Sequence, residues 1–311
     1  MGKTKESMRE ALEEFDELRY SDPSAAIVGI LGFLEDLEPE LVPVALGVLG
    51  SALRLRRDYG VAESVIRRGL EYAEESLDHA TAGNLFQRLS MVFWAQLEYR
   101  EALVENGRAI AKHFDADYEV GLARSYVDRG VIVGSLGHLE WSNKCFKAGL
   151  RLLPEGEPRN LATALQGLSH NLLELGDLPQ ALFYFEATEK VPLDPLNSAK
   201  VEWFRGTTLS ELGRFEEAIE RLSNAIEKLF ILSPNNAAVA TIDLACTFLK
   251  AGEFKKAHRV AGSITRCLGT LGNHKAAIVA ATELANIGLA GKGLTLSFLA
   301  HKRRKISLAC D

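Results

Sequence analysis

The sequence predicts an all-α fold, a solenoid of about six stacked helix pairs with capping helices at both ends. A small residue recurs at intervals of 37 to 40 residues, and a second small residue stands twelve positions before each one. A fixed period in this range is typical of stacked repeats, in which each unit buries its apolar face against its neighbours. The recurring positions, called anchors below, are Ala62, Ala102, Ser142, Ala181, Ala218 and Ala257, and their partners are Gly50, Ser90, Gly130, Ser169, Gly206 and Ala245.

The residues around each anchor predict that one unit is an antiparallel pair of helices. Large apolar residues stand three and nine positions before the anchor, and apolar or small residues stand four and seven positions after it. Offsets of four and seven place residues on one stripe of a helix. Asn106, four positions after Ala102, is an exception. Four repeats have a glycine five positions before the anchor, where a left-handed helix end favours it; these are Gly137, Gly176, Gly213 and Gly252.

The two ends of the chain differ from the middle, as solenoid caps do. Residues 6–18 form an amphipathic pattern, and Asp22-Pro23 is a helix start before a second helix over 26–37. Downstream, 274–289 and 293–305 read as a less regular helix pair. We therefore expect an N-terminal capping pair over residues 1–40, six repeats over 41–270, and a degenerate repeat with a cap over 271–311.

The composition is typical of a soluble helical protein. Apolar residues make up 47% of the 311, and only nine residues are proline. The net charge of −6 does not favour general electrostatic binding of nucleic acid. Residues 1–9 are charged and contain no apolar run typical of a secretory signal, and no apolar stretch is long enough to span a bilayer. A cytoplasmic location is expected.

No residue pattern in the chain indicates catalysis. The stretch 288–293 (GLAGKG) is glycine-rich with a lysine, but it lacks the first glycine and the Ser or Thr of a phosphate-binding loop. The seven histidines have no metal-ligand spacing, and Cys145, Cys246, Cys267 and Cys310 form no close pair. We expect no catalytic residues, no metal site, no cofactor and no enzymatic activity.

The pattern of small and large residues resembles the tetratricopeptide repeat over residues 41–270. The stretch 203–226 follows that family's pattern almost position by position. The resemblance implies a right-handed superhelix whose first helices line a concave groove. The period here exceeds the family's 34 residues. Arg129 and Arg205 also stand where the family has an apolar residue, so either those helices are rotated or the arginines are paired.

The resemblance also implies which residues face the groove, namely those 18, 15, 14 and 11 positions before each anchor. Side-chain amides at these positions can hydrogen-bond an extended peptide backbone, and arginines can bind carboxylates. A tryptophan there would be a rigid apolar anchor. The alternative is that these residues form ordinary solvated helix faces. The predicted partner-binding residues are Asn84, Gln87, Arg88, Arg124, Asp128, Gln166, His170, Lys200, Trp203 and Asp243.

These observations predict a non-catalytic protein- or peptide-binding module with a regulatory or adaptor role in the bacterial cytoplasm. The chain is similar in general character to the long-period repeat halves of bacterial regulators. Co-chaperone members of the family bind a C-terminal carboxylate with Lys or Arg and Asn on successive first helices, and that ordered set does not occur in this sequence. The alternative is a recruiting or inhibitory subunit of a partner enzyme, such as a protease, within a larger complex.

Overall fold

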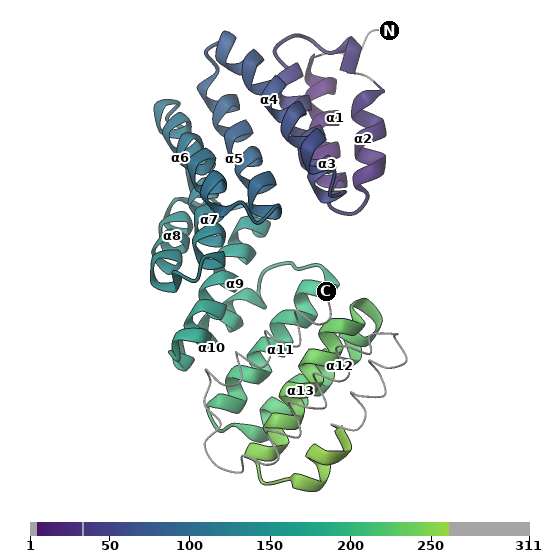
Figure 1. Cartoon of the computed structure of the whole chain (residues 1–311), viewed down its shortest axis with the longest axis vertical. Helices are drawn as coiled ribbons and strands as arrows, with labels where there is room; N and C mark the ends of the chain where they lie inside the picture. Colours follow the sequence, from purple (N-terminus) through teal and green to yellow (C-terminus); the bar gives the residue numbers. More distant parts are fainter. Residues whose placement is uncertain (1–4, 33, 261–311) are drawn as a thin grey trace. The chain divides into compact units, whose positions relative to one another are not determined.

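The computed structural model describes residues 5–32 and 34–260, and these residues form thirteen α-helices, one short 3-10 helix and the start of a further helix over 254–260, without any strand. The expected all-α fold is therefore confirmed (Figure 1). The predicted C-terminal cap over 271–311, the glycine-rich stretch 288–293, Cys267 and Cys310 lie outside the described residues. The helices are α1 (Lys5–Leu18), α2 (Pro23–Leu31), η1 (Leu34–Asp36), α3 (Val42–Leu55), α4 (Tyr59–Glu75), α5 (His79–Ala95), α6 (Tyr99–Asp115), α7 (Glu119–Ser135), α8 (Leu139–Leu152), α9 (Pro158–Leu175), α10 (Leu178–Thr188), α11 (Pro195–Glu211), α12 (Phe215–Leu232) and α13 (Pro234–Lys250).

The chain divides into two compact units, residues 1–160 and 161–311, which we call unit 1 and unit 2. The division falls in the first turn of α9. In unit 1 each helix packs against the next from α3 to α8, and in unit 2 the same holds from α10 to α13. No helix among the described residues has the length and apolar character needed to cross a membrane.

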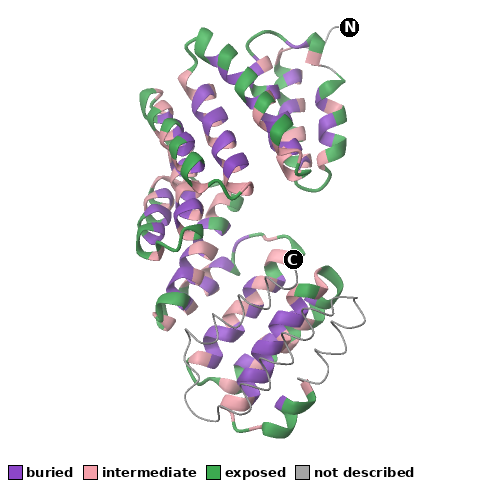
Figure 2. Ribbon diagram, viewed as in Figure 1, coloured by how far each residue is buried: buried purple, intermediate pink, exposed green. Residues whose placement is uncertain are grey.

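The anchors lie where the two helices of a repeat cross closely. All six anchors are buried, and each has at most 3% of its surface exposed. Their glycine partners show why a small residue is needed: a Cβ atom built on Gly50 would lie 2.3 Å from Ile66, and one on Gly130 would lie 2.6 Å from Phe146. Ile66 and Phe146 each stand four positions after an anchor, as the stripe predicts. Figure 2 shows the buried residues on the facing sides of the helices.

In every repeat, the turn between the two helices contains a residue with positive φ at the same position, five residues before the anchor. Four of these residues are glycines, with φ between 78° and 83°. The other two are Arg57 (φ 68°) and Leu97 (φ 66°), so the first two repeats adopt this turn without glycine. A left-handed residue with a Cβ atom costs roughly 1–2 kcal/mol. The packing of the repeat therefore determines the turn even where the local sequence opposes it.

The two arginines at unusual positions are paired. Arg129 on α7 donates from Nε to Oδ1 of Asn106 on α6 at 2.8 Å, and the Asn106 amide donates to the carbonyl of Ser125 at 2.9 Å. The two exceptions to the repeat pattern in unit 1 thus bind each other. Arg205 on α11 forms ion pairs with Glu186, at 2.9 Å, and with Glu189. Its side chain is only 14% exposed.

The N-terminal helices form the pair that the sequence predicts, with one correction. Asp22 caps α2 by accepting from the backbone N–H of Ala25 at 2.9 Å, and Pro23 lies in the first turn. The predicted second helix over 26–37 is wrong at its end, because α2 stops at Leu31 and a 3-10 turn follows. Gly32 is the C-cap of α2, and glycine is a poor helix former.

Replacing Leu97 by glycine should raise the free energy of unfolding by up to about 1 kcal/mol. Leu97 is 70% exposed and left-handed, so the substitution relieves backbone strain while losing little apolar contact. Val104, 55% exposed within α6, is the matched control, because glycine there should cost about 1 kcal/mol. Chemical denaturation measures both, and a destabilised Leu97→Gly protein would contradict the assigned turn.

Candidate partner-binding surface

The first helices of successive repeats in unit 1 contact one another. α3 packs against α5, α5 against α7, and α1 against α3. In a stack of helix pairs these closely packed helices lie on the inside of the curve. We call the side of α1, α3, α5 and α7 that carries the predicted residues the inner face of unit 1. Asn84, Gln87 and Arg88 from α5 and Arg124 and Asp128 from α7 belong to it.

Two predicted amides on the inner face bind neighbouring helices. Gln87 donates from Nε2 to Oδ2 of Asp128 at 2.7 Å, which links α5 to α7. Asn84 lies 3.2 Å from Nε2 of His113, a buried side chain of α6. These bonds set the orientation of both side chains before any partner arrives.

His113 fills a hole between α5 and α7 that two glycines create. A Cβ atom on Gly83 would lie 2.3 Å from the imidazole ring, and one on Gly121 would lie 2.6 Å from it. Nδ1 lies 3.0 Å from Oγ of Ser125. Burial, with a smaller effect from the Arg124 cation, lowers the pKa of His113 to about 4. The ring is therefore neutral near pH 7 and can donate from Nε2 to the Asn84 oxygen.

Ion pairs hold two of the predicted arginines. Arg88 donates to Oγ of Ser51 at 2.7 Å and forms an ion pair with Asp16 on α1 at 2.8 Å. Arg124 binds both carboxylate oxygens of Glu157, with an Nε to Oε2 distance of 3.1 Å. Burial opposes ionisation of Asp16, but Arg88 and Arg19 outweigh it and lower the pKa of that carboxyl.

The carboxyl group of Asp128 is weakly solvated. Burial raises its pKa to about 6, although the Gln87 hydrogen bond and the cations Arg54 and Arg124 act in the opposite direction. The desolvation cost is therefore larger than these attractions. Near pH 7 the group is mostly ionised, at a cost to folding.

Arg19 and Arg54 also belong to the inner face. The sequence prediction did not include them, because it used only the positions 18, 15, 14 and 11 before each anchor. Arg19, 8% exposed, lies at the end of α1 and pairs with Asp16 at 3.1 Å. Burial and the neighbouring Arg88 cation lower its pKa to about 10. Arg54, near the end of α3, is half-buried. The degenerate first repeat has no anchor from which to count, and Arg54 stands eight positions before Ala62, outside the offsets used.

Trp94 on α5 was missed for the same reason, since it also stands eight positions before its anchor. Its indole N–H donates to Oγ of Ser135 on α7 at 2.9 Å, and the side chain is half-buried. Trp94 therefore gives the inner face of unit 1 the aromatic side chain that the prediction assigned to residue 203.

In unit 2 the structure places Trp203 and Asp243 inside the packing of α11 against α13. Both residues are 5% exposed, and the indole N–H donates to Oδ2 of Asp243 at 2.6 Å. Thr207 donates to the same oxygen at 3.3 Å, and the Trp203 ring stacks on Phe204. The prediction of Trp203 as an apolar anchor facing the groove is corrected, because its ring is buried against the helix of the next repeat.

The other predicted residues of unit 2 are half-buried and come from α9 and α11. His170 packs edge-on against Phe204, with ring centroids 4.1 Å apart. Gln166 lies one turn before it on α9, and Lys200 lies near the start of α11. We treat these three residues as a separate surface of unit 2.

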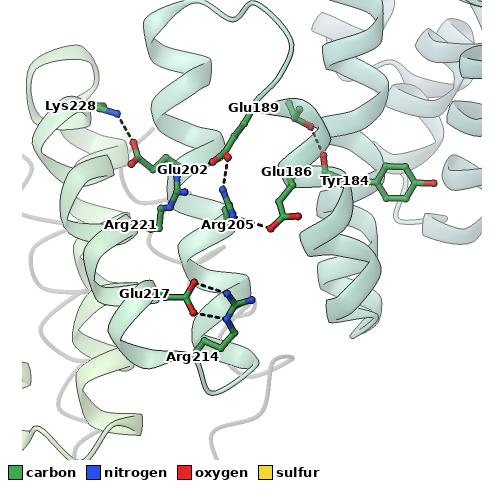
Figure 3. Close-up of polar contacts among 10 residues, drawn as sticks. Tyr184, Glu186, Glu189, Glu202, Arg205, Arg214, Glu217, Arg221 and Lys228 are labelled. Carbon is green, nitrogen blue, oxygen red and sulfur yellow. Dashed lines mark hydrogen bonds and ion pairs between the residues drawn. The ribbon is translucent and has the colours of Figure 1, made fainter.

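A network of ion pairs covers another side of unit 2, across α10, α11 and α12 (Figure 3). Arg221 binds Glu189 at 3.1 Å, and Lys228 binds Glu202 at 2.6 Å. These four side chains line a depression of about 390 Å³. Because its charged groups already neutralise one another, it offers no unpaired charge to a ligand.

Comparison with solved structures identifies the fold. The apo form of the quorum sensor NprR from B. thuringiensis aligns with 99% of this chain and 88% of its own, with a TM-score of 0.67 and 13% identity. A Rap protein complexed with Competence and Sporulation Factor aligns over 99% of this chain and 88% of its own, with a TM-score of 0.60 and 15% identity. The C-terminal part of a TPR repeat-containing protein from Cytophaga hutchinsonii aligns over 84% of this chain and 94% of its own, with a TM-score of 0.50 and 15% identity.

No model of a protein family matches the sequence, and no curated protein matches it. The structural likenesses show that the fold is the tetratricopeptide-type helical repeat, as the sequence predicted. At these levels of identity they establish the fold alone.

His113 should make the free energy of unfolding fall as pH decreases from about 6.5 to 4. Its folded pKa lies below the ordinary value, so the unfolded chain binds the proton more readily in this window, and the loss should reach roughly 3 kcal/mol. Denaturation of the wild type and His113→Gln at several pH values measures this difference. His138→Gln, at an exposed histidine, should keep the wild-type slope, and an equal slope in His113→Gln would contradict the assignment.

Asp128→Asn should stabilise the protein at pH 7 by about 1–2 kcal/mol. The raised folded pKa means that ionised Asp128 destabilises the fold above about pH 6, and the amide removes that charge while Oδ1 can still accept from Gln87. The full shift corresponds to roughly 3 kcal/mol, reduced here because the side chain is partly exposed. The gain should vanish near pH 4. Glu220→Gln, on the exposed side of α12, should change stability by less than about 0.5 kcal/mol.

Proposed function

We propose that this chain is a non-catalytic protein- or peptide-binding module with a regulatory or adaptor role in the bacterial cytoplasm. It binds a segment of its partner on the inner face of unit 1. Asn84, Gln87, Arg88, Arg124 and Asp128 contact the segment. Gln166, His170 and Lys200 form a second contact surface on unit 2, which Trp203 and Asp243 support from beneath.

One observation carries this proposal: polar side chains on successive first helices are held in fixed orientations by bonds one repeat apart. Gln87 and Asp128 join α5 to α7, and Arg88 joins α5 to Ser51 on α3. A surface whose side chains are already ordered loses less conformational entropy when it binds a ligand. Such a row of amides and charges suits an extended chain, whose backbone has donors and acceptors at regular intervals.

The comparisons support the proposal. The Rap structure contains a bound factor, and NprR is named a quorum sensor. Both align with 99% of this chain. These are properties of other proteins, and they make a peptide or protein ligand the first class to test here.

Site-specific photocrosslinking tests the location of the partner. A photoreactive phenylalanine analogue replaces Met91, which lies on the inner side of α5, or Val104, which is exposed on α6. Ultraviolet irradiation in a lysate of the host should link a partner to position 91 and leave position 104 unlinked. Mass spectrometry then identifies the linked segment, and calorimetry with the synthetic segment measures its direct binding to the purified chain.

Adducts only at position 104, or a linked segment that fails to bind the purified chain, would contradict the proposal. If the partner is an enzyme such as a protease, adding the purified chain to that enzyme tests the alternative role. A recruiting or inhibitory subunit would change the turnover of the enzyme, whereas a binding module of another kind would leave it constant.

A further inference from the structure

Arginines gather on the inner face of unit 1 although the chain as a whole is acidic, with a net charge of −6. Four of them belong to four successive segments of the inner face: Arg19 directly follows α1, Arg54 lies on α3, Arg88 on α5 and Arg124 on α7. Arginines on one face attract anionic partners only to the extent that neighbouring carboxylates do not neutralise them.

Three of these arginines already have carboxylate partners. Asp16 binds Arg19 at 3.1 Å and Arg88 at 2.8 Å. Glu157 binds Arg124 in a bidentate pair. These pairs stabilise the inner face itself, so they leave little charge for a ligand.

Arg54 differs because its guanidinium group forms no hydrogen bond or ion pair with the described residues. The side chain is half-buried, and burial lowers its pKa. Electrostatic interactions with Asp128 and Tyr20 raise the pKa of Arg54, and the Arg88 cation lowers it. A partly desolvated guanidinium without a partner costs free energy in the unbound protein. A ligand carboxylate would recover that cost through a bidentate pair.

Tyr20 gives this position a flat apolar neighbour. The phenol is 46% exposed, and the guanidinium of Arg19 lies 4.3 Å from the ring centroid. Arg159, at the start of α9, lies 3.7 Å from the same centroid and pairs with Glu17 of α1 at 2.7 Å. The two ends of unit 1 therefore meet beside the arginine cluster and frame it.

Resting on the function proposed above, we propose that the inner face of unit 1 binds an acidic peptide segment, and that Arg54 binds one of its Asp or Glu carboxylates. Arg88 and Arg124 remain paired with Asp16 and Glu157, so Arg54 provides the charge that distinguishes an acidic segment from a neutral one. A basic segment is disfavoured, because it would place a second cation next to the unpaired Arg54.

A phage-displayed library of random dodecapeptides, selected against the full-length chain, tests the proposal. Peptides recovered on the wild type should be enriched in Asp and Glu, and selection on Arg54→Gln should lose that enrichment. The most enriched peptide is then synthesised with a fluorophore and titrated by anisotropy. Arg54→Gln, or replacement of the peptide's acidic residues by their amides, should weaken binding at least tenfold, and Arg54→Lys should weaken it less.

Matched controls separate binding from folding. Arg100, exposed on α6, is the charge control, and Arg100→Gln should leave peptide affinity unchanged. Arg54→Met should keep or raise the melting temperature, because the guanidinium forms no hydrogen bond or ion pair with the described residues and Met retains an apolar chain of similar length. A clear fall in melting temperature would show that Arg54 is structural and would overturn the proposal.

The remaining outcomes separate the two proposals. Selected peptides without acidic enrichment that still crosslink to position 91 would overturn the acidic-ligand inference and leave the function standing. Failure to recover any peptide, together with no adduct at position 91, would overturn both. A twelve-nucleotide DNA strand that binds as tightly as the acidic peptide, with the same dependence on Arg54, would assign the cluster to phosphate and overturn the peptide proposal.

Discussion

The close crossing of two helices at a pair of small residues is the constraint on which the rest of this structure depends. A Cβ atom at Gly50 or Gly130 would overlap the large side chain of the facing helix, so the two backbones approach only where this atom is missing or small. Once the crossing is fixed, the turn between the helices must close in the same way in each repeat. Leu97 and Arg57 adopt positive φ for this reason. Local backbone preference therefore yields to packing.

Polar side chains join neighbouring repeats in register with the sequence period. Gln87 binds Asp128, Arg88 binds Ser51, and Trp203 binds Asp243, at separations of 41, 37 and 40 residues. Buried and half-buried hydrogen bonds of this kind are costly when incomplete, so they specify how one repeat sits on the next. They also orient the side chains of the inner face, and the same bonds thus connect stability to ligand binding.

The inner face of unit 1 contains stabilising and destabilising charges side by side. Asp16 and Glu157 are ionised next to arginines, whereas burial raises the pKa of Asp128. Arg54 remains without a partner among the described residues. Groups that a fold leaves unsatisfied are common where proteins bind ligands. This contrast distinguishes the inner face from the ion-pair network of unit 2, where each charge of the depression has its counter-charge.

The sequence by itself determined the helix pairs, the four glycine turns and the buried anchors, because the spacing of small and large residues directly reflects which side of a helix is covered. It also indicated that Arg129 and Arg205 are either on rotated helices or paired, and the structure shows that they are paired. Only the tertiary structure decided that Asn106 binds Arg129, that Trp203 is buried, and that Trp94 and Arg54 join the inner face. These facts depend on contacts between residues a full repeat apart. A pattern read within one repeat predicts the face on which a side chain lies, but the neighbouring repeat decides whether that side chain is covered, paired or left unpaired.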